Sequence, residues 1–101
     1  MHTTAQNQNV LMAPERIIAA TRDDFRAAAI AHLDRLATDT QALLIDLSQT
    51  VELDASGLGI LVLIQKRAKE RGLSTHLHNT PERVRNLLKL TMLDFLFELK
   101  D

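Results

Sequence analysis

Asp54-Ala55-Ser56-Gly57-Leu58-Gly59 is the stretch in which an extended chain turns into a helix. Before it, the apolar run 42–47 is typical of a buried strand. After it, the segment 58–70 has the length of a helix and ends in cationic residues just before Gly72, which is typical of a helix C-terminus. We therefore expect a helix that begins at Ser56, with this serine at the N-cap or within one residue of it. A hydroxyl there either caps the helix or carries a phosphate, because helix N-termini accept anions.

The N-terminal flank continues the alternation of strands and helices. Residues 10–12 are a short strand candidate before the turn at Pro14, and 16–19 continue extended. Thr21 is the expected N-cap of a helix that runs to about Ala37. Its apolar positions have the spacing of one helix face: Phe25, Ala28, Ala29, Leu33 and Leu36.

The C-terminal flank predicts one more helix and two more strands. Residues 73–78 alternate with the period of a strand, and 95–99 can form a final short strand. Between them, Thr80 as N-cap and Pro81 at the first helical position open a helix. Strands separated by helices predict a single α/β domain with one small, mostly parallel (mixed) sheet of about four to five strands and three to four helices. We expect residues 1–9 to be a disordered polar lead and 10–101 to be the domain.

Composition excludes several classes of function. The chain has 101 residues, a formal net charge of −1 and three aromatic residues, so it lacks the basic surface and the stacking platforms of nucleic-acid binders. It has no cysteine, which excludes disulfides, thiolate zinc sites and cysteine nucleophiles. The longest apolar run, 60–64, is too short to span a membrane, and residues 1–9 lack the apolar core of a secretory signal. We therefore expect a cytoplasmic protein without nucleic-acid binding or membrane insertion.

Residue spacing argues against catalysis. Gly57-Leu58-Gly59 starts a dinucleotide-binding pattern, but Val62 stands where its third glycine belongs, and the P-loop and nucleophile-elbow patterns are absent. A trio of Ser56, His76 and Asp46 can be assembled on paper, as in any small α/β protein. We expect no catalytic residues and no cofactor.

Four further polar side chains have simple structural interpretations. His76 and His78 share one face of a strand, which we interpret as solvent-facing rather than as a metal site, since no third ligand has suitable spacing. His32 lies among polar residues of the first helix. Asp46 ends the strand at 42–47, and we expect it to order the loop that follows.

The helix after Ser56 is apolar on almost every side of its first two turns. A helix on one side of a small sheet buries only one stripe, so apolar surface should remain on it. We favour an interaction face beside Ser56 over a deeply buried helix. The apolar side chains concerned are Leu58, Ile60, Leu61, Val62, Leu63 and Ile64.

Leu43-Leu44-Ile45-Asp46-Leu47-Ser48, followed by Val51-Glu52-Leu53-Asp54-Ala55-Ser56-Gly57-Leu58-Gly59, resembles the signature of STAS domains. More narrowly, it is similar to the anti-sigma factor antagonists, with an aliphatic strand, Asp-Leu-Ser, a spacer, and then Asp-Ala-Ser-Gly-Leu-Gly. The segment 84–94 resembles the helix and turn near the C-terminus of that family, and the match covers about residues 10–99. The N-terminal segment 14–21 is also similar to the corresponding segment of that family, although Ile18 replaces the usual acidic residue.

The resemblance implies a phosphorylation switch at Ser56. In that family the matching serine is phosphorylated by an anti-sigma factor that is a serine kinase of the histidine-kinase-like ATPase type. The unphosphorylated antagonist binds this kinase and frees the sigma factor, and a metal-dependent serine phosphatase resets the cycle. The expected partner-binding residues around Ser56 are Asp54, Ala55, Gly57, Leu58, Ile60 and Leu61.

Two other functions stay open for a STAS domain. One is an accessory subunit of a lipid-transport ABC complex, in which the hydroxyl need not be modified. The other is a module of a stress-sensing, chemotaxis or secretion pathway that uses the same kinase and phosphatase logic. Weak homodimerisation also stays open.

Overall fold

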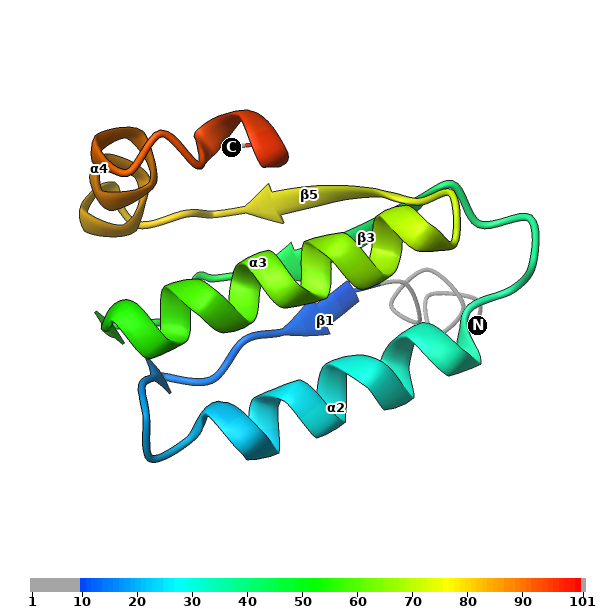
Figure 1. Cartoon of the computed structure of the whole chain (residues 1–101), viewed down its shortest axis with the longest axis horizontal. Helices are drawn as coiled ribbons and strands as arrows, with labels where there is room; N and C mark the ends of the chain where they lie inside the picture. Colours follow the sequence, from blue (N-terminus) through cyan, green and yellow to red (C-terminus); the bar gives the residue numbers. More distant parts are fainter. Residues whose placement is uncertain (1–9, 101) are drawn as a thin grey trace.

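The computed structural model describes residues 10–100, which form two small sheets and the helices that connect their strands (Figure 1). The predicted disordered lead at 1–9 lies outside the described residues. The elements in chain order are β1 (Val10–Met12), β2 (Arg16–Ile17), α2 (Arg22–Arg35), β3 (Ala42–Asp46), β4 (Glu52–Leu53), α3 (Ala55–Glu70), β5 (Ser74–His78), α4 (Glu82–Leu90), the 3-10 turn η1 (Asp94–Leu96) and β6 (Glu98–Lys100).

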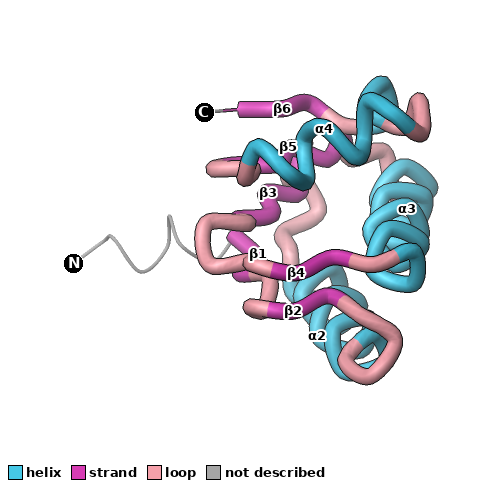
Figure 2. Tube along the Cα trace, turned by 90° about the vertical axis from the view of Figure 1, so that its left-hand side faces the viewer, coloured by secondary structure: helices cyan, strands magenta, loops and turns pink. Residues whose placement is uncertain are grey.

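The main sheet has the strand order β1-β3-β5-β6, and every neighbouring pair is parallel. Each strand is joined to its neighbour by a crossover that contains a helix. Because such crossovers are right-handed and the strands follow in order, the helices of the first two crossovers, α2 and α3, lie on the same face of the sheet. Figures 1 and 2 show α2 and α3 side by side on that face. The predicted α/β class with a small, mostly parallel sheet is confirmed.

The core lies between the main sheet and the pair α2 and α3. In β3, Leu43 and Ile45 are fully buried toward the helices, and in β5 Leu77 is buried in the same way. The alternate residues of these strands lie on the opposite face, where Ser74 is exposed and the others, His76 and His78 among them, are half-buried. The predicted alternation of the strand after Gly72 is therefore confirmed. His32 differs from expectation, because it is buried on the same stripe of α2 as Ala29 and Leu33.

A second, two-stranded parallel sheet joins β2 to β4, with Arg16 opposite Glu52 and Ile17 opposite Leu53. Figure 2 shows the two strands side by side where the chain enters α3. The extended segment expected at 16–19 thus ends at Ile17 as a strand. This small sheet matters because it fixes the chain immediately before Ser56.

Element boundaries differ from the sequence expectations by one to three residues. Asp54 is the N-cap of α3, so Ser56 is the second helical residue rather than the start of the helix. Pro81 is itself the N-cap of α4, because its ψ of 150° is still extended. The last strand begins at Glu98, after η1 has used the preceding residues. Short polar or proline-containing stretches support several local conformations, and tertiary packing selects among them.

Candidate phosphoacceptor and docking surface

The N-terminus of α3 is held by the carboxylate of Asp54. Its Oδ1 accepts a hydrogen bond from the backbone N–H of Gly57 at 2.8 Å, which satisfies one of the unpaired donors of the first turn. Its Oδ2 accepts a second bond from the N–H of Ala19 at 3.2 Å, in the loop before α2. One side chain therefore caps α3 and ties it to a segment 35 residues earlier in the chain.

Gly57 sets how closely α3 approaches β2. A Cβ atom built on this residue would lie 1.8 Å from the carbonyl oxygen of Ile17 and 2.8 Å from Cδ1 of Leu53. No side chain fits there, so the first turn of α3 packs directly against the backbone of the small sheet. At Gly59, by contrast, a Cβ atom would meet no atom within 4 Å. The two glycines of the Gly-Leu-Gly motif therefore have different roles in the fold.

Ser56 is half-buried and lines a cleft of about 320 Å³ at the start of α2 and α3. From α3, the cleft is also lined by Gly59, Ile60 and Leu63. From the first turns of α2 come Arg22, Asp23 and Arg26. The sequence reasoning did not assign α2 to this surface, because no local pattern shows which turns of two helices meet.

The cleft combines both signs of charge close to the hydroxyl. Hydrogen bonds, above all the one from the Gly57 N–H, hold the pKa of Asp54 below its usual 3.8, although partial desolvation opposes this shift. Asp54 is thus ionised at neutral pH, two residues before Ser56. On the α2 side, the guanidinium of Arg22 lies 3.8 Å from the carboxylate of Asp23, and both side chains are exposed. The cleft that contains Ser56 is therefore lined by two cations and one anion from α2, and the ionised N-cap of α3 lies two residues before Ser56 in the chain.

The predicted partner-binding residues divide into exposed and buried groups. Asp54 and Ala55 are exposed, whereas Leu61 is fully buried and Leu58 and Ile60 are each 9% exposed. Gly57 is buried against β2. The expectation that apolar surface remains on the first two turns of α3 holds only for its half-buried side chains, Val62 and Leu63. The role of the named residues in partner binding stays a prediction.

Asp46 orders the loop after β3, as predicted. Its Oδ1 accepts a hydrogen bond from the N–H of Ser48 at 2.8 Å, and its Oδ2 accepts one from Nδ2 of Asn79 at 3.3 Å. Desolvation raises the pKa of this carboxyl, but the hydrogen bonds from Ser48 and Asn79 outweigh it, so the pKa lies below its usual value. Neither His76 nor Asp46 lines the cleft that contains Ser56, so this cleft does not bring together the three side chains of the hypothetical catalytic trio.

Two findings concern metals and membranes. Within residues 10–100, no group of three or more His, Cys, Asp or Glu side chains is arranged to hold a metal ion. None of the helices in this part of the chain has the length and apolarity needed to cross a membrane.

Comparison with known proteins agrees with the fold and the motif. A family model of the STAS domain matches residues 2–101. The structure is similar to that of a candidate anti-sigma factor antagonist from Thermotoga maritima, with a TM-score of 0.75 and 23% identity over 92% of this chain and 80% of that one. It is also similar to a sulfate transporter family protein from Wolinella succinogenes, with a TM-score of 0.63 and 15% identity over 90% of this chain and 76% of that one. Because the family model spans almost the whole chain, this protein belongs to the STAS domain family.

Proposed function

We propose that this protein is an anti-sigma factor antagonist, a non-catalytic switch whose binding surface is controlled by phosphorylation of Ser56. In its unphosphorylated form it binds an anti-sigma factor that is also a serine kinase, and the sigma factor is released. Phosphorylation by that kinase ends the interaction, and a metal-dependent serine phosphatase restores it. The cycle takes place in the cytoplasm, where sigma factors act.

One observation carries the proposal: Ser56 lies on the first turn of α3, on the wall of a cleft, beside a helix terminus that is capped by Asp54. A kinase needs an accessible hydroxyl, and the half-buried position leaves Ser56 accessible. A binding partner needs a surface of fixed shape, which the Asp54 cap and the Gly57 contact provide. The similar fold of the Thermotoga maritima protein supports the same function.

The charge distribution explains how a phosphate would switch binding off. A phosphoserine carries about −1.5 to −2 charges, and at Ser56 it would lie near the ionised Asp54. It would also pair with Arg22 and Arg26, which line the same cleft. A partner surface that docks through apolar contacts and these two cations would then meet a hydrated anion, whose burial is costly.

The test is a binding and phosphorylation experiment with the cognate kinase. We expect wild type and Ser48→Asp to bind the kinase, and Ser56→Asp to lose binding. Mass spectrometry after incubation with ATP should place the phosphate on Ser56, and Ser56→Ala should remain unmodified. Ser48→Asp is the matched control, because Ser48 is an exposed serine in the loop after β3. Full modification of Ser56→Ala, or equal binding by Ser56→Asp, would contradict the proposal.

The second candidate function is a binding module of a transport complex, which the similarity to a sulfate transporter family protein favours. In that case the protein would co-purify with membrane components, and Ser56→Ala and Ser56→Asp would both retain the interaction. The same pair of variants therefore separates the two functions.

A further inference from the structure

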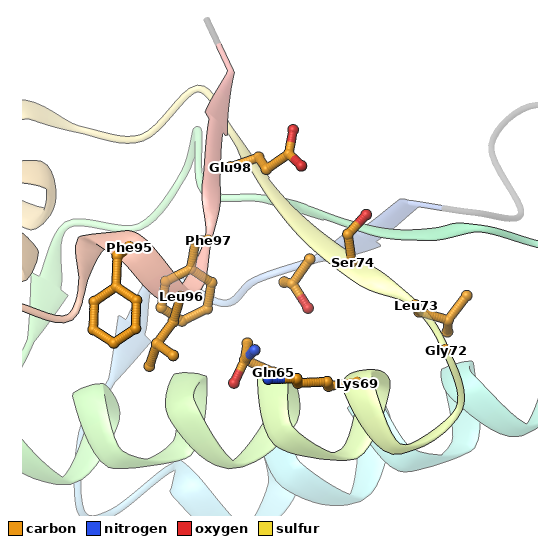
Figure 3. Close-up of a pocket in the computed structure, with 10 residues that line it drawn as sticks. Gln65, Lys69, Gly72, Leu73, Ser74, Phe95, Leu96, Phe97 and Glu98 are labelled. Carbon is orange, nitrogen blue, oxygen red and sulfur yellow. The ribbon is translucent and has the colours of Figure 1, made fainter.

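A cavity of about 460 Å³ lies at the other end of α3 from Ser56 (Figure 3). Its floor is α3, with Gln65 and Lys69 one helical turn apart, and its roof is the start of β5 together with η1 and the start of β6. A second hollow of similar volume adjoins it, since both are lined by Gln65, Lys69 and Leu96. The volume lies within the range of about 300–1,000 Å³ that is typical of small-molecule sites. None of the lining residues of either hollow belongs to the Ser56 cleft.

The cavity contains a buried hydroxyl without a partner. Thr75 is 2% exposed, and among the described residues its Oγ1 has no hydrogen-bond partner. Thr75 occupies a core position of β5, between the fully or largely buried Leu73 and Leu77. Buried hydroxyls are nearly always hydrogen-bonded, so an unpaired one that lines a cavity is the feature expected when a ligand supplies the missing partner.

Other polar and apolar groups surround the same space. Gln65, at 8% exposed, adds a buried amide to the floor. Leu96 and the largely buried Phe97 form an apolar wall on the opposite side, where Figure 3 shows the Leu96 side chain directed toward α3. A ligand therefore meets hydrogen-bonding groups from both the floor (Gln65) and the roof (Thr75) of the cavity, and an apolar wall formed by Leu96 and Phe97.

The charge at the cavity favours an anion. Glu98 lines it, but its carboxylate lies 3.6 Å from Nε2 of His76 and 3.4 Å from Nζ of Lys100. Lys69 takes part in none of the ion pairs formed within residues 10–100. Its ammonium is the cation that remains for a ligand in this cavity, and the adjoining hollow is lined by a second cation, Lys66, and by one carboxylate, Glu70.

We propose that this cavity binds a small organic carboxylate with an apolar body, of the size of a medium-chain fatty acid or an arylalkanoic acid. The carboxylate accepts hydrogen bonds from the Thr75 hydroxyl and the Gln65 amide and pairs with Lys69. The apolar body packs against Leu96 and Phe97. The proposal does not depend on the phosphorylation of Ser56 or on a sigma-factor partner.

The test uses octanoate and 4-phenylbutyrate as probes on the full chain, followed by two-dimensional NMR and by calorimetry. Both probes should bind saturably and shift the amide signals of the cavity residues, while the signals of the Ser56 cleft stay in place. Acetate, which has no apolar body, and octyltrimethylammonium, which has the opposite charge, should not bind at this cavity. Saturable binding of octyltrimethylammonium with equal affinity would overturn the proposal, because it would indicate apolar adsorption without recognition of the carboxylate.

Three variants assign the recognition to named groups. Thr75→Val and Lys69→Met should each weaken octanoate binding about tenfold, the loss expected when one hydrogen bond or cation for a charged group is removed. Lys89→Met makes the same charge change on α4, away from both hollows, and should bind octanoate as wild type does. Without ligand, Thr75→Val should melt at or above the wild-type temperature, since an unpaired buried hydroxyl is lost. Unchanged octanoate affinity in Thr75→Val and Lys69→Met, or a lower melting temperature of free Thr75→Val, would overturn the proposal.

Discussion

At the scale of single residues, we expect alanine substitutions at the two glycines of the Gly-Leu-Gly motif to change the free energy of unfolding in opposite directions. Gly57→Ala would place a Cβ atom 1.8 Å from the Ile17 carbonyl oxygen, so α3 must move away from β2. We expect a loss of at least about 2 kcal/mol in the free energy of unfolding. Gly59→Ala adds its Cβ to open space within α3, and we expect it to stabilise the isolated domain by about 0.5–1 kcal/mol.

Urea denaturation of the Gly57→Ala and Gly59→Ala variants measures both changes in the free energy of unfolding. Equal stabilities would show that the first turn of α3 does not rest on the β2 backbone. If Gly59→Ala also weakens kinase binding while it stabilises the domain, the open space above Gly59 is used by the partner.

From the lowered pKa of the Asp54 carboxyl we predict that the stability of the fold depends on pH. Its pKa in the folded protein lies below its usual 3.8, because the Gly57 N–H and other backbone donors favour the ionised form. A lowered folded pKa contributes stability that is present above the unfolded pKa and is lost as the pH falls through the folded pKa. Asp54→Asn keeps an oxygen for the cap but cannot titrate. Between about pH 5 and about pH 3 its free energy of unfolding should therefore fall less steeply than that of wild type. Parallel curves for the two proteins in urea titrations would contradict the assignment.

At the scale of elements, α3 and α4 end in the same way with different residues. Gly72 and Met92 both have positive φ, at 78° and 59°, and in each case the helix is closed by backbone hydrogen bonds from the residues just past its end. A side chain in this conformation costs about 1–2 kcal/mol, which glycine avoids. Because Met92 is 77% exposed, Met92→Gly loses little packing.

We therefore expect Met92→Gly to raise the free energy of unfolding by about 0.5–1 kcal/mol, and Gly72→Ala to lower it by about 1 kcal/mol. Thermal and urea unfolding of the two variants measure both effects. Destabilisation by Met92→Gly would mean that the methionine side chain contributes contacts that outweigh its backbone cost.

Along α3, we expect substitutions on the buried face to lower stability and substitutions on the accessible face to weaken partner binding. Leu61 is fully buried between α3 and the sheet, so Leu61→Ala should cost about 2–5 kcal/mol of stability. Leu63 is half-buried and lines the Ser56 cleft, so Leu63→Ala should cost about 1 kcal/mol or less while it weakens kinase binding. Thermal melts and binding titrations of the same samples decide this. Similar losses of stability in both variants would place the docking surface elsewhere.

At the scale of the whole molecule, the Ser56 cleft and the cavity lined by Gln65, Lys69 and Thr75 lie at opposite ends of α3. The hydrophobic core includes Ile17 of the small sheet and Leu58 in the first turn of α3, but Ser56 itself is half-buried and lies outside the core cluster. A phosphate on Ser56 should therefore change the surface without unfolding the domain. An anion in the first turn of a helix stabilises it by about 0.3–1 kcal/mol, so the phosphorylated protein should melt at or slightly above the wild-type temperature.

Calorimetry of the phosphorylated protein and of Ser56→Asp tests this, with the untreated protein as control. A large fall in the melting temperature would indicate that the Ser56 hydroxyl supports the core. In that case loss of partner binding would report unfolding rather than a switch.

The local sequence by itself determined the α/β class, the alternation of the main-sheet strands with helices and the end of α3 just before Gly72, but it did not predict the short strand β4. These features follow from short-range periodicity and from residue types with strong backbone preferences. It also determined the loop role of Asp46, since a carboxylate at a strand end pairs with nearby N–H groups. The position of Ser56 near a helix N-terminus was predicted to within a residue or two, and the family followed from the motif around it.

Only the tertiary structure decided what surrounds that serine. Asp54, and not Ser56, caps α3 because β4 pairs with β2 immediately before this residue. The paired residues of β2 and β4 are 36 positions apart in the sequence. The packing of α2 on α3 accounts for the burial of Leu58, Ile60 and His32. It also brings Arg22 and Arg26 to the cleft that contains Ser56. The unpaired Thr75 hydroxyl could likewise not be predicted, because buried and more exposed residues alternate along β5 as in any strand. Periodicity shows which face of an element is apolar, but the neighbour that covers this face is set by contacts between distant segments of the chain.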